Sequence, residues 1–387
     1  MDKLHFIKAI CHQSSREQGY QVAPNEIKEK YDHEVVFDNS VIDLVNNNIK
    51  LSDGYQELYS YIKDYSKENP TKKIITIGGD HSVSASTVAA MNEKYMRQTG
   101  DNVDSDLIIL WIDAYPDLHD FKSSPNKDLN DMPAGSLLGL CGTAFTRNKL
   151  LVKSSQFIYY GLLDHDDNID MVKEYHIPYL SEKKIRILGD NNINVIKEMI
   201  KDKPVHVSLD MKVFNSSVTQ SVIPVNDKGL NVEQIEKLLI AIKDNIVAFD
   251  VTEFNPCVGS KESSKLTREI IRYLLSRTFD MKEKSINIFT EDSQFLIYRP
   301  VNQENPHADI GWYILKGLDL ETRNNIINEI DNDDIEIIEI EDEEYFITKT
   351  TMNEQYGKSY HCAKTIHDTT LFPEEKLSMC FELLNTK

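Results

Sequence analysis

Four apolar segments of this 387-residue sequence each end in side chains that could bind a metal ion. The first reads Ile-Ile-Thr-Ile-Gly-Gly-Asp-His-Ser, so two glycines and then His81 follow a β-branched stretch that is typical of a buried parallel strand. The other three segments end in carboxylates, which are Asp113 and Asp117, Asp210, and Asp250 with Glu253. Because open α/β sheets bind ligands at the carboxyl ends of their strands, this combination predicts a metal site at one sheet edge.

The elements that must position these side chains can be predicted from hydrophobic periodicity. Residues 72–77, 106–112, 156–161, 205–209 and 246–251 are predicted strands. Helical spacing covers residues 54–67, 84–96, 195–201, 231–243 and 265–277. Because strands alternate with helices, the sequence predicts an α/β fold with a parallel sheet and right-handed crossovers.

In order and wording, the four motifs resemble those of the arginase/agmatinase (ureohydrolase) family. Residues 78–82, Gly-Gly-Asp-His-Ser, match the family's first metal motif, and residues 250–256, Asp-Val-Thr-Glu-Phe-Asn-Pro, match the fourth. Residues 113–117 and 208–212 resemble the second and third motifs, and residues 19–27 loosely resemble the family's N-terminal Gly-x-x-x-Gly-Pro-x-x-Leu. The resemblance covers roughly the first three-quarters of the chain and implies a three-layer, parallel-sheet arginase-like fold.

The resemblance also implies a set of metal ligands. The ligands of a first Mn(II) ion would be His81, Asp113, Asp117 and Asp210, and all four are present. A second ion would need a His at 115 and an Asp at 212, but the chain has Tyr115 and Lys212 there. A phenol stays protonated at neutral pH, and an ammonium has no acceptor lone pair. We therefore expect one divalent metal ion, for which Mn(II) is suitable, or a metal-free carboxylate cluster paired with Lys212.

Two interpretations of Lys212 stay open. Its ammonium could replace the second ion's charge beside Asp210 and Glu253, because residues 210 and 212 at a strand end point to the same side. Alternatively, the side chain extends to solvent from a site that has lost its function. His119, two residues after Asp117, is either a substitute ligand or an ordinary loop histidine.

On the substrate side, the resemblance assigns roles to three further residues. Glu253 corresponds to the residue that receives the substrate guanidinium, and Asp166 to the one that contacts the substrate amino group. Asn130 stands where the family has a His that transfers protons, and an amide has no pKa suited to that role. The catalytic machinery is therefore altered at Tyr115, Asn130 and Lys212, while both substrate-side acids remain.

Three functions follow from this pattern. The first is a pseudoenzyme that has lost binuclear-manganese guanidino hydrolysis and keeps a binding or structural role, with a small guanidino or amide ligand. The second is a single-metal hydrolase of C–N bonds in amidine or amide substrates. The third is a structural assembly subunit without a ligand. We favour the first, because three simultaneous losses are hard to reconcile with a standard hydrolase.

Net charge, the length of apolar runs and cysteine content limit the partners and compartments to be expected for this protein. The net charge of −20 argues against a nucleic-acid backbone or an anionic membrane surface as the main partner. Apolar runs stay short of membrane-spanning length, and the N-terminus lacks a secretory segment. Five scattered cysteines indicate free thiols in a reducing compartment, so we expect a cytoplasmic protein. The resemblance implies a homo-oligomer.

The character of the sequence changes near Asp280. Residues 285–289 and 294–298 predict a β-hairpin, residues 319–330 a helix, and residues 335–347 a second hairpin with an acidic turn. We therefore predict a ureohydrolase-like domain at 1–282 and an appended α+β module at 283–387. The module is interpreted as a structural cap or an oligomerisation element.

Overall fold

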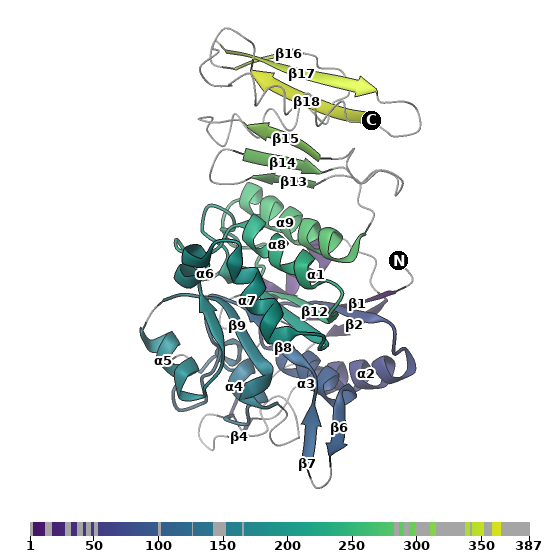
Figure 1. Cartoon of the computed structure of the whole chain (residues 1–387), viewed down its shortest axis with the longest axis vertical. Helices are drawn as coiled ribbons and strands as arrows, with labels where there is room; N and C mark the ends of the chain where they lie inside the picture. Colours follow the sequence, from purple (N-terminus) through teal and green to yellow (C-terminus); the bar gives the residue numbers. More distant parts are fainter. Residues whose placement is uncertain are drawn as a thin grey trace. The chain divides into compact units, whose positions relative to one another are not determined.

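The computed structural model divides into two compact units, Met1–Ile271 and Arg272–Lys387 (Figure 1). The residues that it describes are 3–11, 18–27, 32–36, 42–43, 48–49, 53–99, 102–125, 127–141, 152–164, 166–281, 286–289, 294–298, 310–314, 337–340, 343–351 and 358–364. The division between the units falls inside helix α9 (Lys261–Phe279). Because that helix is continuous, we keep a domain boundary at 282/283 as a proposal.

An eight-stranded sheet forms the centre of the first unit, in the order β10-β9-β8-β11-β12-β5-β1-β2. Each pair of neighbours is parallel. The strands are β1 (Leu4–Ile10), β2 (His33–Val36), β5 (Lys73–Ile77), β8 (Ile108–Ile112), β9 (Phe157–Leu162), β10 (Tyr179–Ser181), β11 (Val205–Asp210) and β12 (Ile246–Thr252). β8 and β11 are buried along their whole length, as expected for central strands covered on both faces.

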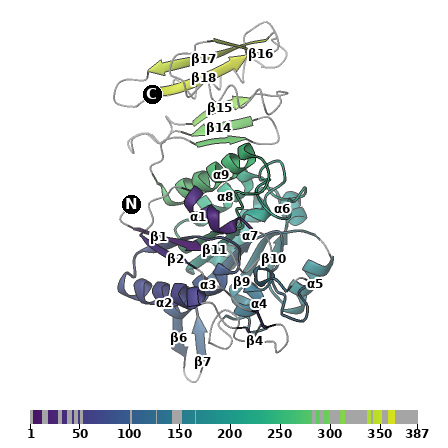
Figure 2. The ribbon, with the colours of Figure 1, turned by 180° about the vertical axis from the view of Figure 1, so that it is seen from behind.

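Helices cover both faces of this sheet, with α2 and α3 on one side and α7 and α8 on the other (Figures 1 and 2). The helices are α1 (Ala23–Glu26), α2 (Asp53–Glu68), α3 (Val83–Lys94), α4 (Pro133–Leu137), α5 (Asp166–Glu174), α6 (Glu182–Leu188), α7 (Asn191–Ile200), α8 (Val232–Ile242) and α9. In α8, Asn231 and Gln234 form a capping box, and the predicted apolar face is buried. The predicted three-layer α/β fold is therefore confirmed.

The predicted strands and helices of this unit are present, with ends that differ by a few residues. One difference bears on the site, because the chain leaves β11 at Asp210 and residues Met211–Val213 form a 3-10 helix. Lys212 was expected on the strand end and instead lies in this tight turn. Strand β1, the edge strands β2 and β10, and the hairpin of β6 (Met96–Thr99) and β7 (Asn102–Ser105) were not predicted from the sequence.

The second unit contains two small antiparallel sheets. One consists of β13 (Ile286–Phe289), β14 (Gln294–Tyr298) and β15 (Ile310–Ile314), and the other of β16 (Ile337–Ile340), β17 (Glu343–Thr351) and β18 (Lys358–Lys364). Both predicted hairpins pair as expected, β13 with β14 and β16 with β17. The helix predicted at 319–330 lies outside the described residues.

Two further findings concern the described residues of the whole chain. None of their helices combines the length and apolar character that a membrane crossing requires. Among the described residues, Cys11, Cys141 and Cys257 form no disulfide bond.

Candidate metal centre

The loop between β5 and α3 fixes the position of His81. Gly79 packs so closely against the end of β1 that an added Cβ would lie 2.3 Å from the carbonyl oxygen of Cys11, which only glycine tolerates. The loop is also tied to the end of β12, because Glu253 N donates to Gly79 O at 2.8 Å. His81 N in turn donates to Glu253 Oε1 at 2.8 Å. His81 and Glu253 are therefore held side by side by backbone contacts.

Two of the carboxylates are each oriented by a hydrogen bond from the backbone N–H two residues later. Asp113 follows β8 and accepts a hydrogen bond on Oδ1 from Tyr115 N at 3.0 Å. Asp210 ends β11 and accepts one on Oδ1 from Lys212 N at 2.6 Å. These turns occupy Oδ1 in both residues, so that Oδ2 is free to face the centre of the site.

All four predicted first-metal ligands meet at one point. Nδ1 of His81 lies 3.0 Å from Asp113 Oδ2, 2.8 Å from Asp117 Oδ2 and 3.1 Å from Asp210 Oδ2. The four side chains are buried, and within the described part of the chain these same four atoms lack a well-aligned hydrogen-bond partner. Asp117 adopts a left-handed backbone, with φ of 48°, which is a conformation often found at functional sites.

This arrangement fits a divalent metal ion. Adjacent donor atoms that lie about 2.1 Å from an octahedral ion are roughly 3.0 Å apart, close to the observed separations. Three carboxylate oxygens and one imidazole nitrogen suit a hard or borderline ion such as Mn(II). The grouping of His81, Asp113, Asp117 and Asp210 is therefore a candidate metal site, with its donor atoms all within 4.8 Å of one another.

A relay of hydroxyls determines which nitrogen of His81 carries its proton. His81 Nε2 contacts Ser208 Oγ at 2.8 Å, Ser208 Oγ donates to Ser84 Oγ at 2.9 Å, and Ser84 Oγ donates to Asp250 Oδ2 at 3.0 Å. Each hydroxyl has a single proton, so Ser208 must accept a hydrogen bond from Nε2–H. Nδ1 of a neutral His81 therefore carries the lone pair, directed at the three carboxylates, where a cation is needed.

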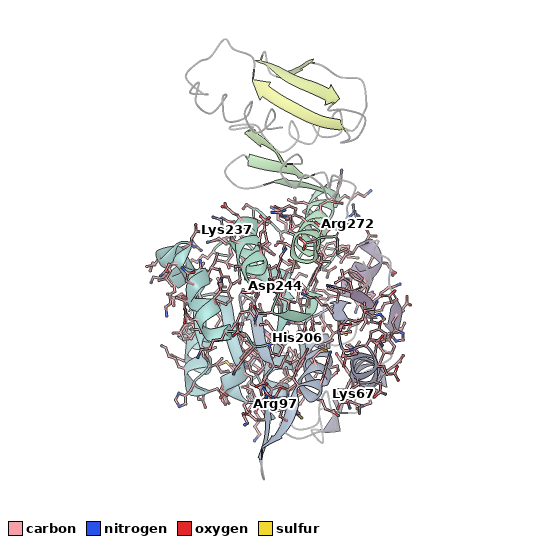
Figure 3. The ribbon with its side chains drawn as sticks, turned by 45° about the vertical axis from the view of Figure 1, so that its right-hand side comes forward. Lys67, Arg97, His206, Lys237, Asp244 and Arg272 are labelled. Carbon is pink, nitrogen blue, oxygen red and sulfur yellow. The ribbon has the colours of Figure 1, made fainter. Side chains whose placement is uncertain are left out.

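The relay ends at a buried pair of side chains. His206 lies on β11 inside the body of the protein (Figure 3), and its Nε2 donates to Asp250 Oδ2 at 2.9 Å. Asp250, predicted as one of the strand-end carboxylates, therefore belongs to the relay rather than to the group of ligand atoms. No role was predicted for Ser84 or His206, which lie outside the four motifs, or for Ser208, because only the Asp of its motif was taken as a ligand.

Replacing Ser208 with Ala should weaken Mn(II) binding by about 10–100-fold, because His81 loses the acceptor that fixes its tautomer and ring orientation. Isothermal titration calorimetry, in which Mn(II) is added to the metal-free protein, measures the dissociation constant of each variant. Ser86→Ala is a matched control, since Ser86 is also buried but has no hydrogen-bond partner among the described residues. Equal affinities for the two variants would show that the relay does not support the metal site.

Lys212 is buried and points into the site. Its side chain is 5% exposed, and its Nζ lies 3.3 Å from Asp210 Oδ2 and 3.5 Å from Glu253 Oε2. The same Nζ lies 5.8 Å from the centre of the half-buried Tyr115 ring, a contact of the cation–π type. The side chain therefore does not extend to solvent.

The charges of the site are strongly coupled through these contacts. Although burial opposes it, the carboxylates of Asp210 and Glu253 hold the pKa of Lys212 well above its usual range. Lys212 and His81 in turn keep the pKa of Asp210 below its usual value, despite burial. Burial and the neighbouring Asp113 raise the pKa of Asp117 well above its usual value. The pKa shifts of Asp210 and Asp117 thus differ in direction, because Lys212 is paired with Asp210.

Glu253 is fully buried, and two of its polar neighbours, Asn130 and Tyr20, come from the short 3-10 helices Leu129–Asp131 and Tyr20–Val22. Asn130 Nδ2 donates to Glu253 Oε1 at 3.5 Å. Burial first, and then the charge and hydrogen bonding of Glu253, raise the pKa of the buried Tyr20 hydroxyl well above its usual range. Burial also raises the pKa of Glu253 to about 7, although Lys212 lowers it. Tyr20 was not predicted, because it occupies an unspecified position of the N-terminal motif.

The other predicted site residues are Tyr115, Asp166 and His119, and they are not among the four candidate metal ligands. Tyr115 contacts the site through its backbone N–H, which donates to Asp113, and through its ring, which lies beside the Lys212 ammonium. Asp166 begins α5, and its side chain lies outside what the structure describes. His119 is outside the ligand group, and its Nδ1 contacts Ser123 Oγ at 3.3 Å in a loop. It is therefore an ordinary loop histidine within the described structure.

Comparison with known proteins identifies the relatives of this architecture. Residues 4–276 match the model of the Arginase family. An arginase of Schizosaccharomyces pombe is 27% identical over 223 residues, which cover 53% of this chain and 65% of that protein. An arginase of Plasmodium berghei is 27% identical over 205 residues, covering 49% of this chain and 55% of the relative. The chain thus spans less than two thirds of the length of these curated relatives.

Solved structures support the same fold. The arginase of Bacillus caldovelox superposes with a TM-score of 0.62 at 18% identity, covering 73% of this chain and 99% of that chain. The arginase of Entamoeba histolytica, in complex with L-ornithine, gives a TM-score of 0.60 at 17% identity over the same shares of both chains. At these identities the comparison establishes the fold alone.

Proposed function

The chain belongs to the arginase family, and from this premise we propose that it is a single-metal member that has lost guanidino hydrolysis and keeps a binding role. The intact grouping of His81, Asp113, Asp117 and Asp210 supports a retained divalent ion, with Mn(II) the best match to its donors. The replacements at positions 115, 130 and 212 support the loss of arginase chemistry. A homo-oligomeric, cytoplasmic protein remains part of this proposal.

The observation that carries the proposal is the position of the Lys212 ammonium. A second ion would share Asp210 with the first, yet Lys212 Nζ lies 3.3 Å from Asp210 Oδ2. The ammonium also lies 3.5 Å from Glu253 Oε2. A buried cation at this place offsets the repulsion among the acids that a second metal ion would otherwise offset.

The chemistry available to this site is limited by its own residues. When bound, a divalent ion would polarise a ligand oxygen and lower the pKa of a water molecule. Asn130, in the place of the family's proton-transferring His, neither takes up nor releases a proton near neutral pH. Tyr115 keeps its proton, because burial raises the pKa of its phenol.

A second candidate function is single-metal hydrolysis of an amide or amidine C–N bond. The position of Glu253 favours it: this buried carboxyl accepts a hydrogen bond from the backbone of the ligand candidate His81, and burial raises its pKa to about 7, which suits a general acid or base at neutral pH. The two candidates share the metal site and differ in turnover. The third function, a subunit without a ligand, does not account for the four buried donor atoms that lack a hydrogen-bond partner among the described residues.

Urea release from arginine and agmatine should be negligible, even with added Mn(II). The physical reason is the lack of a second ion and of a proton-transferring side chain at position 130. A colorimetric urea assay on the Mn(II)-loaded chain measures the rate, with an active arginase as the positive control. Turnover in the ordinary enzyme range, about 10 per second, would reject the loss of arginase activity.

A further inference from the structure

We propose that the site binds a neutral carboxamide or ureido group and rejects a guanidinium cation, with Lys212 as the specificity-determining residue. This inference rests on the proposed function, because it concerns the ligand of the same site. It depends on the charge and the free hydrogen-bonding atoms around Glu253.

The charge of Lys212 excludes a second cation. Its ammonium lies 3.5 Å from Glu253 Oε2, and both side chains are buried. A guanidinium that paired with Glu253 would lie a few ångströms from this ammonium, where little solvent screens the repulsion between like charges. A neutral ligand avoids this repulsion.

Two buried oxygen atoms determine which hydrogen bonds a ligand could form in the site. Glu253 Oε2 and Asn130 Oδ1 are buried and accept no well-aligned hydrogen bond among the described residues, and Glu253 Oε2 lies 3.5 Å from the Lys212 ammonium. Asn130 is oriented by its own amide, because Nδ2 donates to Glu253 Oε1 at 3.5 Å. Both atoms are acceptors with lone pairs left over, so that the ligand should bring N–H groups to them.

Lys212 supplies the complementary donor. Its ammonium has three N–H groups, and its ion pairs within the described residues are those to Asp210 and Glu253. A remaining N–H can donate to a ligand oxygen. A carboxamide or ureido group carries a carbonyl acceptor and N–H donors in one planar unit, which matches this set without adding charge.

The test compares L-arginine with L-citrulline, which have the same length and differ in having a guanidinium or a neutral ureido group. Isothermal calorimetry on the Mn(II)-loaded full chain gives both dissociation constants. We expect wild type to bind citrulline at least about tenfold more tightly than arginine. Lys212→Met should reverse this order. Lys237→Met, at an exposed position on α8 (Figure 3), should leave it unchanged.

A second variant keeps the test independent of the folding of Lys212→Met. Asn130→Asp adds a negative charge and retains Lys212, so it should raise the affinity for arginine relative to citrulline. Equal or tighter arginine binding by wild type would overturn the proposal. So would an unchanged preference in both variants, or binding of neither ligand to wild type. The metal content of the same samples shows which proposal has failed. If wild type holds no ion, the proposed single-metal function is refuted; if it holds one ion, only the ligand proposal is refuted.

Discussion

Lys212→Met should lower the free energy of unfolding by about 3–5 kcal/mol at neutral pH, because it leaves buried carboxylates without their cation. The ammonium of Lys212 is within 3.5 Å of two buried acids, Asp210 and Glu253. Both acids are fully buried, so water does not screen the repulsion between their charges. Chemical denaturation in the presence of EDTA isolates this effect from metal binding.

The deficit should shrink on acidification. Burial already raises the pKa of Glu253 above its ordinary value of 4.5, to about 7, and Lys212 acts to lower it. Without Lys212, the pKa of the folded-state carboxylates rises further. The folded state then binds more protons than the unfolded state above pH 4.5, so the free energy of unfolding falls as pH rises through that window. Protonation at acidic pH therefore restores part of the stability.

Lys237→Met is the control for the loss of a lysine as such. Lys237 pairs with Asp190 and Glu233 at an exposed position, where ion pairs contribute little to stability. Its unfolding free energy should stay within about 1 kcal/mol of wild type. A Lys212→Met variant with the stability of wild type at every pH would show that Lys212 does not balance the charge of the acids.

Tyr115→His combined with Lys212→Asp should create a second metal site and make stability depend strongly on Mn(II). The two changes add an imidazole and a carboxylate beside Asp113 and Asp210, and they remove the ammonium that would repel an ion. Binding to the folded state alone stabilises it by about 2.7 kcal/mol when the free ion is at 100 times its dissociation constant.

Thermal melts over a Mn(II) series measure this gain. The melting temperature of the double variant should rise with Mn(II) more steeply than that of wild type, and the variant should lose stability in EDTA. Lys212→Asp alone is the matched control, because Tyr115 still cannot act as a ligand at neutral pH. Identical Mn(II) dependence in wild type and double variant would mean that position 212 does not occupy a second metal site.

The sequence could predict the metal site because its geometry follows from the parallel sheet. β5, β8 and β11 are apolar runs that end in His81, Asp113 and Asp210, and the carboxyl ends of neighbouring parallel strands meet at one edge. Strand order places β8 beside β11, so Asp113 and Asp210 are brought together by the topology alone.

Other features depended on contacts between segments that are distant in the sequence. The 3-10 turn at Met211–Val213 could not be read from hydrophobic periodicity, because it lasts for three residues. Tyr20 and Ser84 act through partners more than 160 residues away, Glu253 and Asp250 respectively. The edge strand β2 has only four residues, too few for a clear alternating pattern.

The most direct test of a single-metal site is the Mn(II) content of the purified chain after incubation with Mn(II) and desalting. Elemental analysis should give one ion per chain, bound by His81, Asp113, Asp117 and Asp210, and His81→Ala should remove it. Two tightly held ions per chain would contradict the account, because Tyr115 and Lys212 would then not prevent a second site. A content of zero in wild type would show that Lys212 and the carboxylates form a metal-free cluster.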